Sequence, residues 1–169
     1  GGSTEWLETA AEVRRKNGRQ SERETCGKKA DAGTDGKMAE DGQVAPDTGY
    51  VNPKYLLSIL SDYLPEDAIV TTEVGQNQIW AANNYKVKKP RTFITSGGLG
   101  TMGYGLPSAV GAKVGRPGST VAVISGDGSF QMSMQELGTM KQYGIDVKIV
   151  LFNNRRLGMV RELQLTRHG

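Results

Sequence analysis

The chain has 169 residues, a formal net charge of +3, and 37% hydrophobic and 23% charged residues. This length fits about one domain, and the small positive charge gives no argument for binding nucleic acid. No apolar run approaches the roughly 20 residues that cross a bilayer, so we expect no membrane segment. The single cysteine, Cys26, and the single histidine, His168, exclude a disulfide framework, a cysteine zinc site and a histidine-based catalytic triad.

The composition divides the chain into regions of different character. Residues 1–20 contain a short amphipathic stretch around Trp6, which we interpret as the helical end of a preceding domain. Residues 21–49 are polar and cannot bury enough apolar surface to offset the entropy of ordering, so they are predicted to be a linker. Residues 50–169 form the predicted folded domain. The chain starts without methionine, so its true N-terminus is expected to lie further upstream. It stops shortly after the segment 157–160, so we expect this domain to be incomplete at its C-terminus.

From residue 50 on, helical and strand patterns alternate. Asn52 is predicted to cap a first helix, 53–63, with Pro53 in its first position. The apolar stripe of this helix is predicted to consist of Tyr55, Leu56, Ile59, Leu60 and Tyr63. The elements that follow are predicted to be a strand 68–72, a helix 76–83, a strand 92–95, a helix 103–114, a strand 120–125, a helix 129–143 and a strand 147–152.

The strands 120–125 and 147–152 are continuously apolar, which is typical of strands buried on both faces. Strands of this kind, separated by helices, predict a mainly parallel sheet between helical layers, that is, a three-layer α/β fold.

Polar residues follow these two apolar strands directly. Gly126-Asp127-Gly128 comes after the first strand, and Asn153-Asn154 after the second. Parallel strands end at the same edge of a sheet, which is where open α/β sheets bind ligands, so Asp127 and Asn154 are expected to converge. One carboxylate and one carboxamide are ligands for a hard cation such as Mg²⁺ or Ca²⁺.

Phosphate is the second expected ligand of this edge. The glycines on both sides of Asp127 allow a close approach of the backbone, and Ser129 is predicted to begin a helix, whose N-terminus attracts phosphate. Together these features indicate a diphosphate held through a metal ion. The alternative is that both polar segments are ordinary turns.

The spacing of Gly126-Asp127-Gly128, 24 further residues and Asn153-Asn154 resembles the thiamine diphosphate motif. The resemblance implies that Asp127, Asn154 and the backbone carbonyl of Arg156 bind Mg²⁺. The segments 72–80, 96–109 and 157–160 further resemble the large, catalytic subunit of acetolactate synthase (acetohydroxyacid synthase). The likeness covers roughly residues 50–165.

The resemblance also implies roles for individual residues. Residues 74–77 would line the diphosphate pocket, the Gly100 carbonyl would accept a hydrogen bond from the aminopyrimidine, and Met102 would wedge the cofactor into a bent shape. Met159, Val160 and Leu163 would face the substrate. The full set of implied cofactor-binding residues is Val74, Gly75, Gln76, Asn77, Gly100, Met102, Gly126, Asp127, Gly128, Ser129, Asn154, Leu157, Gly158, Met159 and Val160.

The activity implied by the resemblance is decarboxylation of pyruvate and transfer of the two-carbon unit to a second 2-oxo acid. The family uses thiamine diphosphate and Mg²⁺, with FAD in the full-length protein, which is a homodimer or homotetramer with a possible small regulatory subunit. We expect a cytoplasmic, prokaryotic location. The activating glutamate of the family lies on another domain, so we expect no catalytic residue here and no turnover by this chain alone.

Three departures from the family pattern are visible. Asn77 stands where the family often has His, and Glu73 stands where it often has Asp. Leu163 occupies a position where many members carry a Trp that favours 2-ketobutyrate, so pyruvate is the expected second substrate here.

Other interpretations stay open at this point. The run Gly98–Gly103 fits the dinucleotide fingerprint G-x-G-x-x-G, although only a short strand precedes it. A different thiamine diphosphate enzyme, such as a 2-oxo acid decarboxylase or oxidase, would share Asp127 and Asn154. A non-catalytic domain that kept the fold is the third alternative. Two basic clusters, one at Arg155, Arg156 and Arg161 and one in residues 86–91, either attract anions or are solvated surface.

Overall fold

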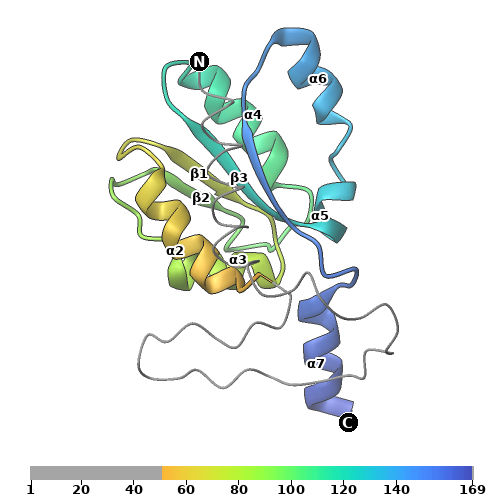
Figure 1. Ribbon diagram of the computed structural model, residues 1–169. Helices are drawn as coiled ribbons and strands as arrows, with labels where there is room; N and C mark the ends of the chain where they lie inside the picture. The colour runs from red at the N-terminus through yellow and green to blue at the C-terminus, as the bar shows by residue number, and fades with distance from the viewer. Residues whose placement is uncertain (1–50, 169) are drawn as a thin grey trace, which may run out of the picture. The chain divides into compact units, whose positions relative to one another are not determined.

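A four-stranded parallel sheet is the centre of residues 51–168, which are the residues that this computed structural model describes (Figure 1). The spatial order of the strands is β2-β1-β3-β4, and each neighbouring pair is parallel. The strands are β1 (Ile69–Thr72), β2 (Phe93–Thr95), β3 (Val121–Gly126) and β4 (Lys148–Phe152). The predicted helical remnant, 1–20, and the predicted linker, 21–49, lie outside the described residues.

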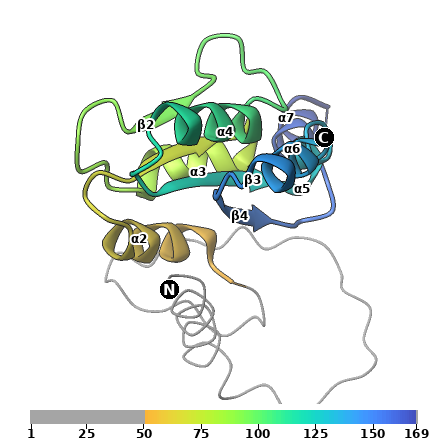
Figure 2. The same ribbon diagram turned by 90° about the horizontal axis from the view of Figure 1, so that it is seen from above.

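Helices cover both faces of this sheet. The covering helices are α2 (Pro53–Tyr63), α3 (Gln76–Asn84), α4 (Gly105–Gly115), α5 (Asp127–Gln131) and α6 (Glu136–Tyr143), whereas α7 (Gly158–His168) extends away from the sheet (Figure 1). Across the sheet, the chain moves in one direction from β1 to β2 and in the opposite direction from β2 to β3. Because crossovers between parallel strands are normally right-handed, α3 and α4, which lie in these two connections, are expected on opposite faces. Helix α2 packs on α3, and α6 packs on α4. Figure 2 shows α2 and α4 on opposite sides of the strands, which confirms the predicted layered α/β class.

An apolar core cluster lies between the sheet and α4. Leu106 and Ala109 of α4 are fully buried against β-strand residues, and the cluster consists of Ile69, Leu106, Ala109, Val121, Val123 and Val147. Burying a side chain of the size of Leu106 stabilises the fold by about 1.5–3 kcal/mol. This core holds the sheet and the start of α4 in one rigid arrangement.

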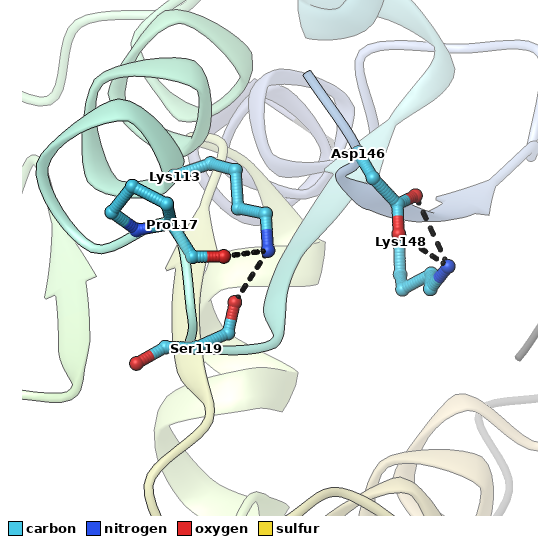
Figure 3. A network of polar contacts seen from close by, with 5 residues as sticks. All are labelled: Lys113, Pro117, Ser119, Asp146 and Lys148. Atoms are coloured by element: carbon cyan, nitrogen blue, oxygen red, sulfur yellow. Dashed lines mark hydrogen bonds and ion pairs between the residues drawn. The ribbon is translucent and has the colours of Figure 1, made fainter. Parts of the chain in front are cut away.

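Two lysines make polar contacts at the amino ends of β3 and β4 (Figure 3). Lys113 Nζ donates to the carbonyl oxygens of Pro117 and Ser119, at 2.8 Å each, and so fastens the turn from α4 into β3. Lys148, the first residue of β4, pairs with Asp146 at 3.0 Å. These contacts lie at the amino ends of β3 and β4, away from the predicted ligand edge.

Most predicted elements are confirmed within two residues of their predicted ends, but the predicted helix 129–143 is wrong. The chain instead forms α5, which starts at Asp127, and α6, with turns over residues 132–135 between them. Met132, Ser133 and Glu136 donate their backbone N–H groups to carbonyls three residues back. Such tighter bonding is typical of 3₁₀ turns and interrupts the α-helix.

Two burial predictions also need correction. The predicted strand 147–152 is expected to be buried on both faces, but Ile149 and Leu151 of β4 are exposed, because alternate side chains of a strand share a face and the described residues leave this face of β4 uncovered. In α2 the buried face is Leu57, Leu60 and Ser61 rather than the predicted stripe, and Tyr55 and Tyr63 are exposed. The predicted helical period is present but the buried face is shifted by one position. No helix within residues 51–168 is long and apolar enough to span a membrane.

Candidate functional site

The carboxyl ends of β3 and β4 meet, as the sequence predicts. Gly126 pairs with Phe152 in the parallel register, so the chain leaves both strands at the same level. Asp127 follows immediately after the first, and Asn154 comes two residues after the second. Both residues line one cavity of about 240 Å³, so two segments far apart in the sequence share one site.

The residues of the predicted cofactor site lie together around this cavity. Every residue predicted to bind the cofactor lines it, and Arg156, the third predicted metal ligand, does so too. Four segments of the described chain form the walls, namely the start of α3 with residues 74–77, the loop before α4 with Gly100 and Met102, the turn after β3, and the turn after β4. Most of the exposed lining is apolar, as expected of a pocket for an organic cofactor.

Two aromatic lining residues were missed in the sequence analysis. Trp80 and Phe152 also line the cavity, and their rings meet edge to face at a centroid distance of 5.7 Å. Trp80 lies four residues after Gln76 on α3, so the two share a helix face. The four-residue spacing from Gln76 was therefore the feature of the sequence that could have identified Trp80 as a lining residue.

The oxygens predicted to hold a cation are arranged by the turn after β4. Asn154 Oδ1 accepts a hydrogen bond from the Arg156 backbone N–H at 3.1 Å, and Asn154 Nδ2 donates to Gln76 Oε1 at 3.3 Å. Asn153 makes the corresponding turn with the N–H of Arg155, whose φ is 56°. The Asn154 carboxamide is thus oriented from both ends while its oxygen keeps a second lone pair for a ligand.

The donor set fits Mg²⁺ together with a diphosphate. Within residues 51–168 no group of three or more His, Cys, Asp or Glu side chains could hold a metal, so Asp127 would be the one charged ligand in this site. Mg²⁺ binds through one or two carboxylates and completes its shell with phosphate oxygens and water. A cation at this position therefore needs an anionic ligand to share it.

Glycines let the backbone form the wall around this position. A Cβ on Gly128 would stand 2.7 Å from Leu157 Cδ2, and a Cβ on Gly126 would stand 3.3 Å from Asn77 Oδ1. A Cβ on Gly158 would overlap Gln76 Oε1. A side chain at any of these positions would have to displace a neighbouring side chain of the cavity, whereas glycine lets the turns after β3 and β4 lie close to a ligand.

Asn77 is a buried polar residue that joins α3 to the sheet. Its Nδ2 donates to the carbonyl oxygens of Glu73 at 3.0 Å and Ile124 at 3.2 Å. Because both partners are acceptors, the amide nitrogen must face them, which leaves Oδ1 directed toward Gly126.

Glu73 was noted in the sequence only as a departure from the family pattern. In the structure its side chain is fully buried, and both carboxylate oxygens accept backbone hydrogen bonds from residues 103, 105 and 106. Nothing in the local sequence around Glu73 indicates this burial, which depends on the approach of α4.

Some predicted residues lie apart from the cavity. Leu163 is exposed on α7 and does not line it, whereas Met159 and Val160 do. In the basic stretch 86–91, Lys86 pairs with Asp62 and Lys89 pairs with Glu66 on the surface. These pairs favour the interpretation of this stretch as solvated surface over that of an anion-binding cluster. The dinucleotide alternative is disfavoured because β2, the strand before Gly98, has only three residues.

A parallel α/β domain with a glycine-lined oxygen site at its carboxyl edge is the architecture of a diphosphate-binding domain. The family pattern of the thiamine pyrophosphate enzyme C-terminal TPP binding domain matches residues 73–169, which is more than half of the chain. The chain therefore belongs to this family.

The individual relatives are acetolactate synthases. The isozyme 2 large subunit of Escherichia coli (strain K12) is 61% identical over 109 residues, which is 64% of this chain and 20% of the relative. The enzyme of Arthrospira platensis is 63% identical over 98 residues, 58% of this chain and 17% of the relative. The large subunit of Lactococcus lactis is 48% identical over 119 residues, 70% of this chain and 21% of the relative. The chain thus spans about a fifth of the length of these curated relatives.

Proposed function

We propose that this chain is the pyrophosphate-binding part of an acetolactate synthase large subunit, and that it binds thiamine diphosphate through Mg²⁺. The observation that carries the proposal is the meeting of Asp127 and Asn154 in one cavity that every predicted cofactor-binding residue lines. The similarity to acetolactate synthases of three organisms supports the choice of enzyme.

The chain's own residues would hold and orient the cofactor. The Asp127 carboxylate, the Asn154 carboxamide oxygen and the Arg156 carbonyl would bind Mg²⁺, and none of them would transfer a proton. Gly126, Gly128 and the segment 74–77 would surround the diphosphate with backbone and amide groups. When bound, thiamine diphosphate supplies the electron sink for decarboxylating pyruvate and passing the two-carbon unit to a second 2-oxo acid.

The opposite wall of the cavity would position the rings of the cofactor. The Gly100 carbonyl would accept a hydrogen bond from the aminopyrimidine, and Met102 would support the bend between the rings with its flexible, polarizable side chain. In the structure the Met102 methyl group lies 3.9 Å from the place of a Cβ on Gly128, so this side chain reaches across toward the metal end. Met159 and Val160 would contact the substrate.

The remaining features belong to the longer protein that the relatives represent. We propose pyruvate as the second substrate because Leu163 replaces the tryptophan found in many members. The activating glutamate, FAD, the dimeric or tetrameric assembly and a small regulatory subunit would be contributed outside this chain, in a cytoplasmic enzyme. Product analysis of that longer protein separates this proposal from another thiamine diphosphate decarboxylase, because the former forms acetolactate from pyruvate and the latter acetaldehyde.

Titration calorimetry of the 169-residue chain with thiamine diphosphate tests the proposal directly. We expect weak binding with Mg²⁺ present and none after chelation of the metal, with no acetolactate formed from pyruvate. Binding that is independent of a divalent ion would contradict the metal site. Turnover near the rate of a full-length enzyme would contradict the assignment of this chain as a binding part only.

A further inference from the structure

Glu73 holds a loop of the cavity by hydrogen bonds to its backbone. Its Oε2 accepts from the N–H of Gly103 at 2.8 Å, and its Oε1 accepts from the N–H groups of Gly105 at 2.8 Å and Leu106 at 3.2 Å. The side chain is fully buried, and no cationic side chain pairs with it among residues 51–168. The carboxylate is therefore satisfied by backbone N–H groups, two of which begin α4, where the helix dipole favours a negative charge.

The segment that Glu73 holds is the 96–104 loop, which carries Gly100 and Met102 into the cavity wall. Packing does not fix its middle, because Leu99 is 94% exposed and a Cβ on Gly98 or Gly100 would meet nothing within 4 Å. Its first end is held where Gln78 Nε2 donates to the Ser96 carbonyl at 3.3 Å.

The second half of the loop has two hydrogen bonds, one on either side of Met102, within residues 51–168: the Thr101 N–H donates to Ser96 Oγ at 3.1 Å, inside the loop itself, and the Gly103 N–H donates to Glu73, outside it. Gly103 has a φ of 85°, and its backbone N–H is bonded to the Glu73 carboxylate one residue after Met102. The Thr101 bond only joins the loop to itself, so the position of Met102 relative to the sheet depends on the Gly103 bond to Glu73 and on the start of α4. Glu73 itself is rigid, because its own N–H donates to the Ile124 carbonyl of β3 at 2.8 Å.

We propose that Glu73 is a positioning residue that fixes Gly100 and Met102, and hence the half of the site that receives the rings of the cofactor. This inference rests on the proposed function. On this proposal the cavity has two halves. Asp127 and Asn154 hold the metal and diphosphate in one half, and Glu73 positions the 96–104 loop, which forms the ring-binding wall of the other half. A neutral glutamine cannot replace the carboxylate, because one of its two terminal atoms is a donor that would face an N–H group.

The test compares two ligands on the Glu73→Gln variant of this chain. Thiamine diphosphate with Mg²⁺ needs both halves of the site, whereas inorganic pyrophosphate with Mg²⁺ needs only the metal end. We expect thiamine diphosphate affinity to fall about tenfold or more and pyrophosphate affinity to stay within about threefold. Amide hydrogen exchange at Gly103 and Gly105 should accelerate. Glu66→Gln, the same change at an exposed surface acid, should alter none of these quantities.

A second variant keeps the test decisive if Glu73→Gln does not fold. Gly103→Ala leaves the buried carboxylate in place but displaces the loop, because its φ is positive and its Cβ would stand 3.2 Å from Met132 Cβ. We expect the same selective loss of thiamine diphosphate affinity.

Several outcomes would overturn the inference. Unchanged thiamine diphosphate affinity in the variants, or an equal loss for both ligands, would show that Glu73 does not act through the ring-binding wall. If the unmodified chain bound neither ligand, the proposed function would fail, and unchanged amide exchange at Gly103 in Glu73→Gln would then independently refute the hold on the loop.

Discussion

Gly126 of β3 and Phe152 of β4 face each other in the parallel register of the sheet. Because the two strands run in the same direction, the residues after them emerge at one edge, and Asp127 and Asn154 line one cavity there. The helices between the strands separate these residues widely in the sequence. The convergence of Asp127 and Asn154 is thus a direct consequence of the parallel pairing of neighbouring strands.

Asp127→Ala should abolish binding of thiamine diphosphate that depends on Mg²⁺. Among the described residues that line the cavity, Asp127 has the one carboxylate, and the neutral oxygens of Asn154 and Arg156 are weak ligands for Mg²⁺ without it. Its cost in stability should be limited to about 0.3–1 kcal/mol for an acid in the first turn of α5. Titration calorimetry and urea unfolding measure the two effects separately.

Asp146→Ala is the matched control for this prediction. Asp146 is an exposed acid that precedes β4 at the opposite end of the strand, where it pairs with Lys148. Its removal should leave cofactor binding unchanged. Retained Mg²⁺-dependent binding in Asp127→Ala would reject the metal assignment.

Gly158→Ala should weaken binding of pyrophosphate with Mg²⁺ without unfolding the domain. The added methyl group would overlap Gln76 Oε1 and lie 2.9 Å from Asn154 Nδ2, so it breaks the contact that orients the Asn154 carboxamide. Loss of a contact that orients a metal ligand typically costs about 10–100-fold in affinity. Stability should change by less than about 1 kcal/mol, because Ala suits the start of α7 and α7 has no buried residue.

The same substitution at Gly138 controls for a general effect of alanine. Gly138 lies in α6, and a Cβ there would meet nothing within 4 Å. Gly138→Ala should bind pyrophosphate as the unchanged chain does. Equal affinities of the two variants would show that the contact between Gln76 and Asn154 does not support the site.

The sequence was sufficient to predict that Asp127 and Asn154 lie at one edge of the sheet, because this placement depends on local features. The apolar run 120–125 marks a buried strand, and the polar residues Asp127 and Asn154 mark where the chain leaves the sheet. Parallel pairing then brings them together without further information. The family likeness added the other residues that are predicted to bind the cofactor, all of which line the cavity.

Features that depend on distant packing were not predictable in this way. Glu73 has a polar side chain after a strand, like many solvent-exposed residues, and only the start of α4 makes it buried. The break between α5 and α6 follows no glycine or proline, since residues 132–135 are Met-Ser-Met-Gln. Ile149 and Leu151 are exposed because the described residues leave one face of β4 uncovered, which the apolar character of these residues does not indicate.

Asn77→Asp should destabilise the domain by about 2–3 kcal/mol. In the folded structure Nδ2 of Asn77 donates to the carbonyls of Glu73 and Ile124, and a carboxylate would oppose both acceptors in a buried position. Urea unfolding measures the loss. Asn83→Asp, an exposed position of the same helix, should change stability by no more than about 0.5 kcal/mol. A similar small effect at Asn77 would mean that its amide does not join α3 to the sheet.

Gly105→Ala should lower stability by roughly 1–3 kcal/mol, because a Cβ there would stand 2.7 Å from the Glu73 backbone nitrogen and 2.8 Å from the Thr72 carbonyl carbon. These are backbone atoms of the sheet and cannot move aside as a flexible side chain would. Gly111→Ala lies in the same helix with open space around its Cβ, and it should raise stability by about 0.5–1 kcal/mol. Thermal unfolding should therefore shift in opposite directions for the two variants. Shifts in the same direction would contradict the close packing of α4 on the end of β1.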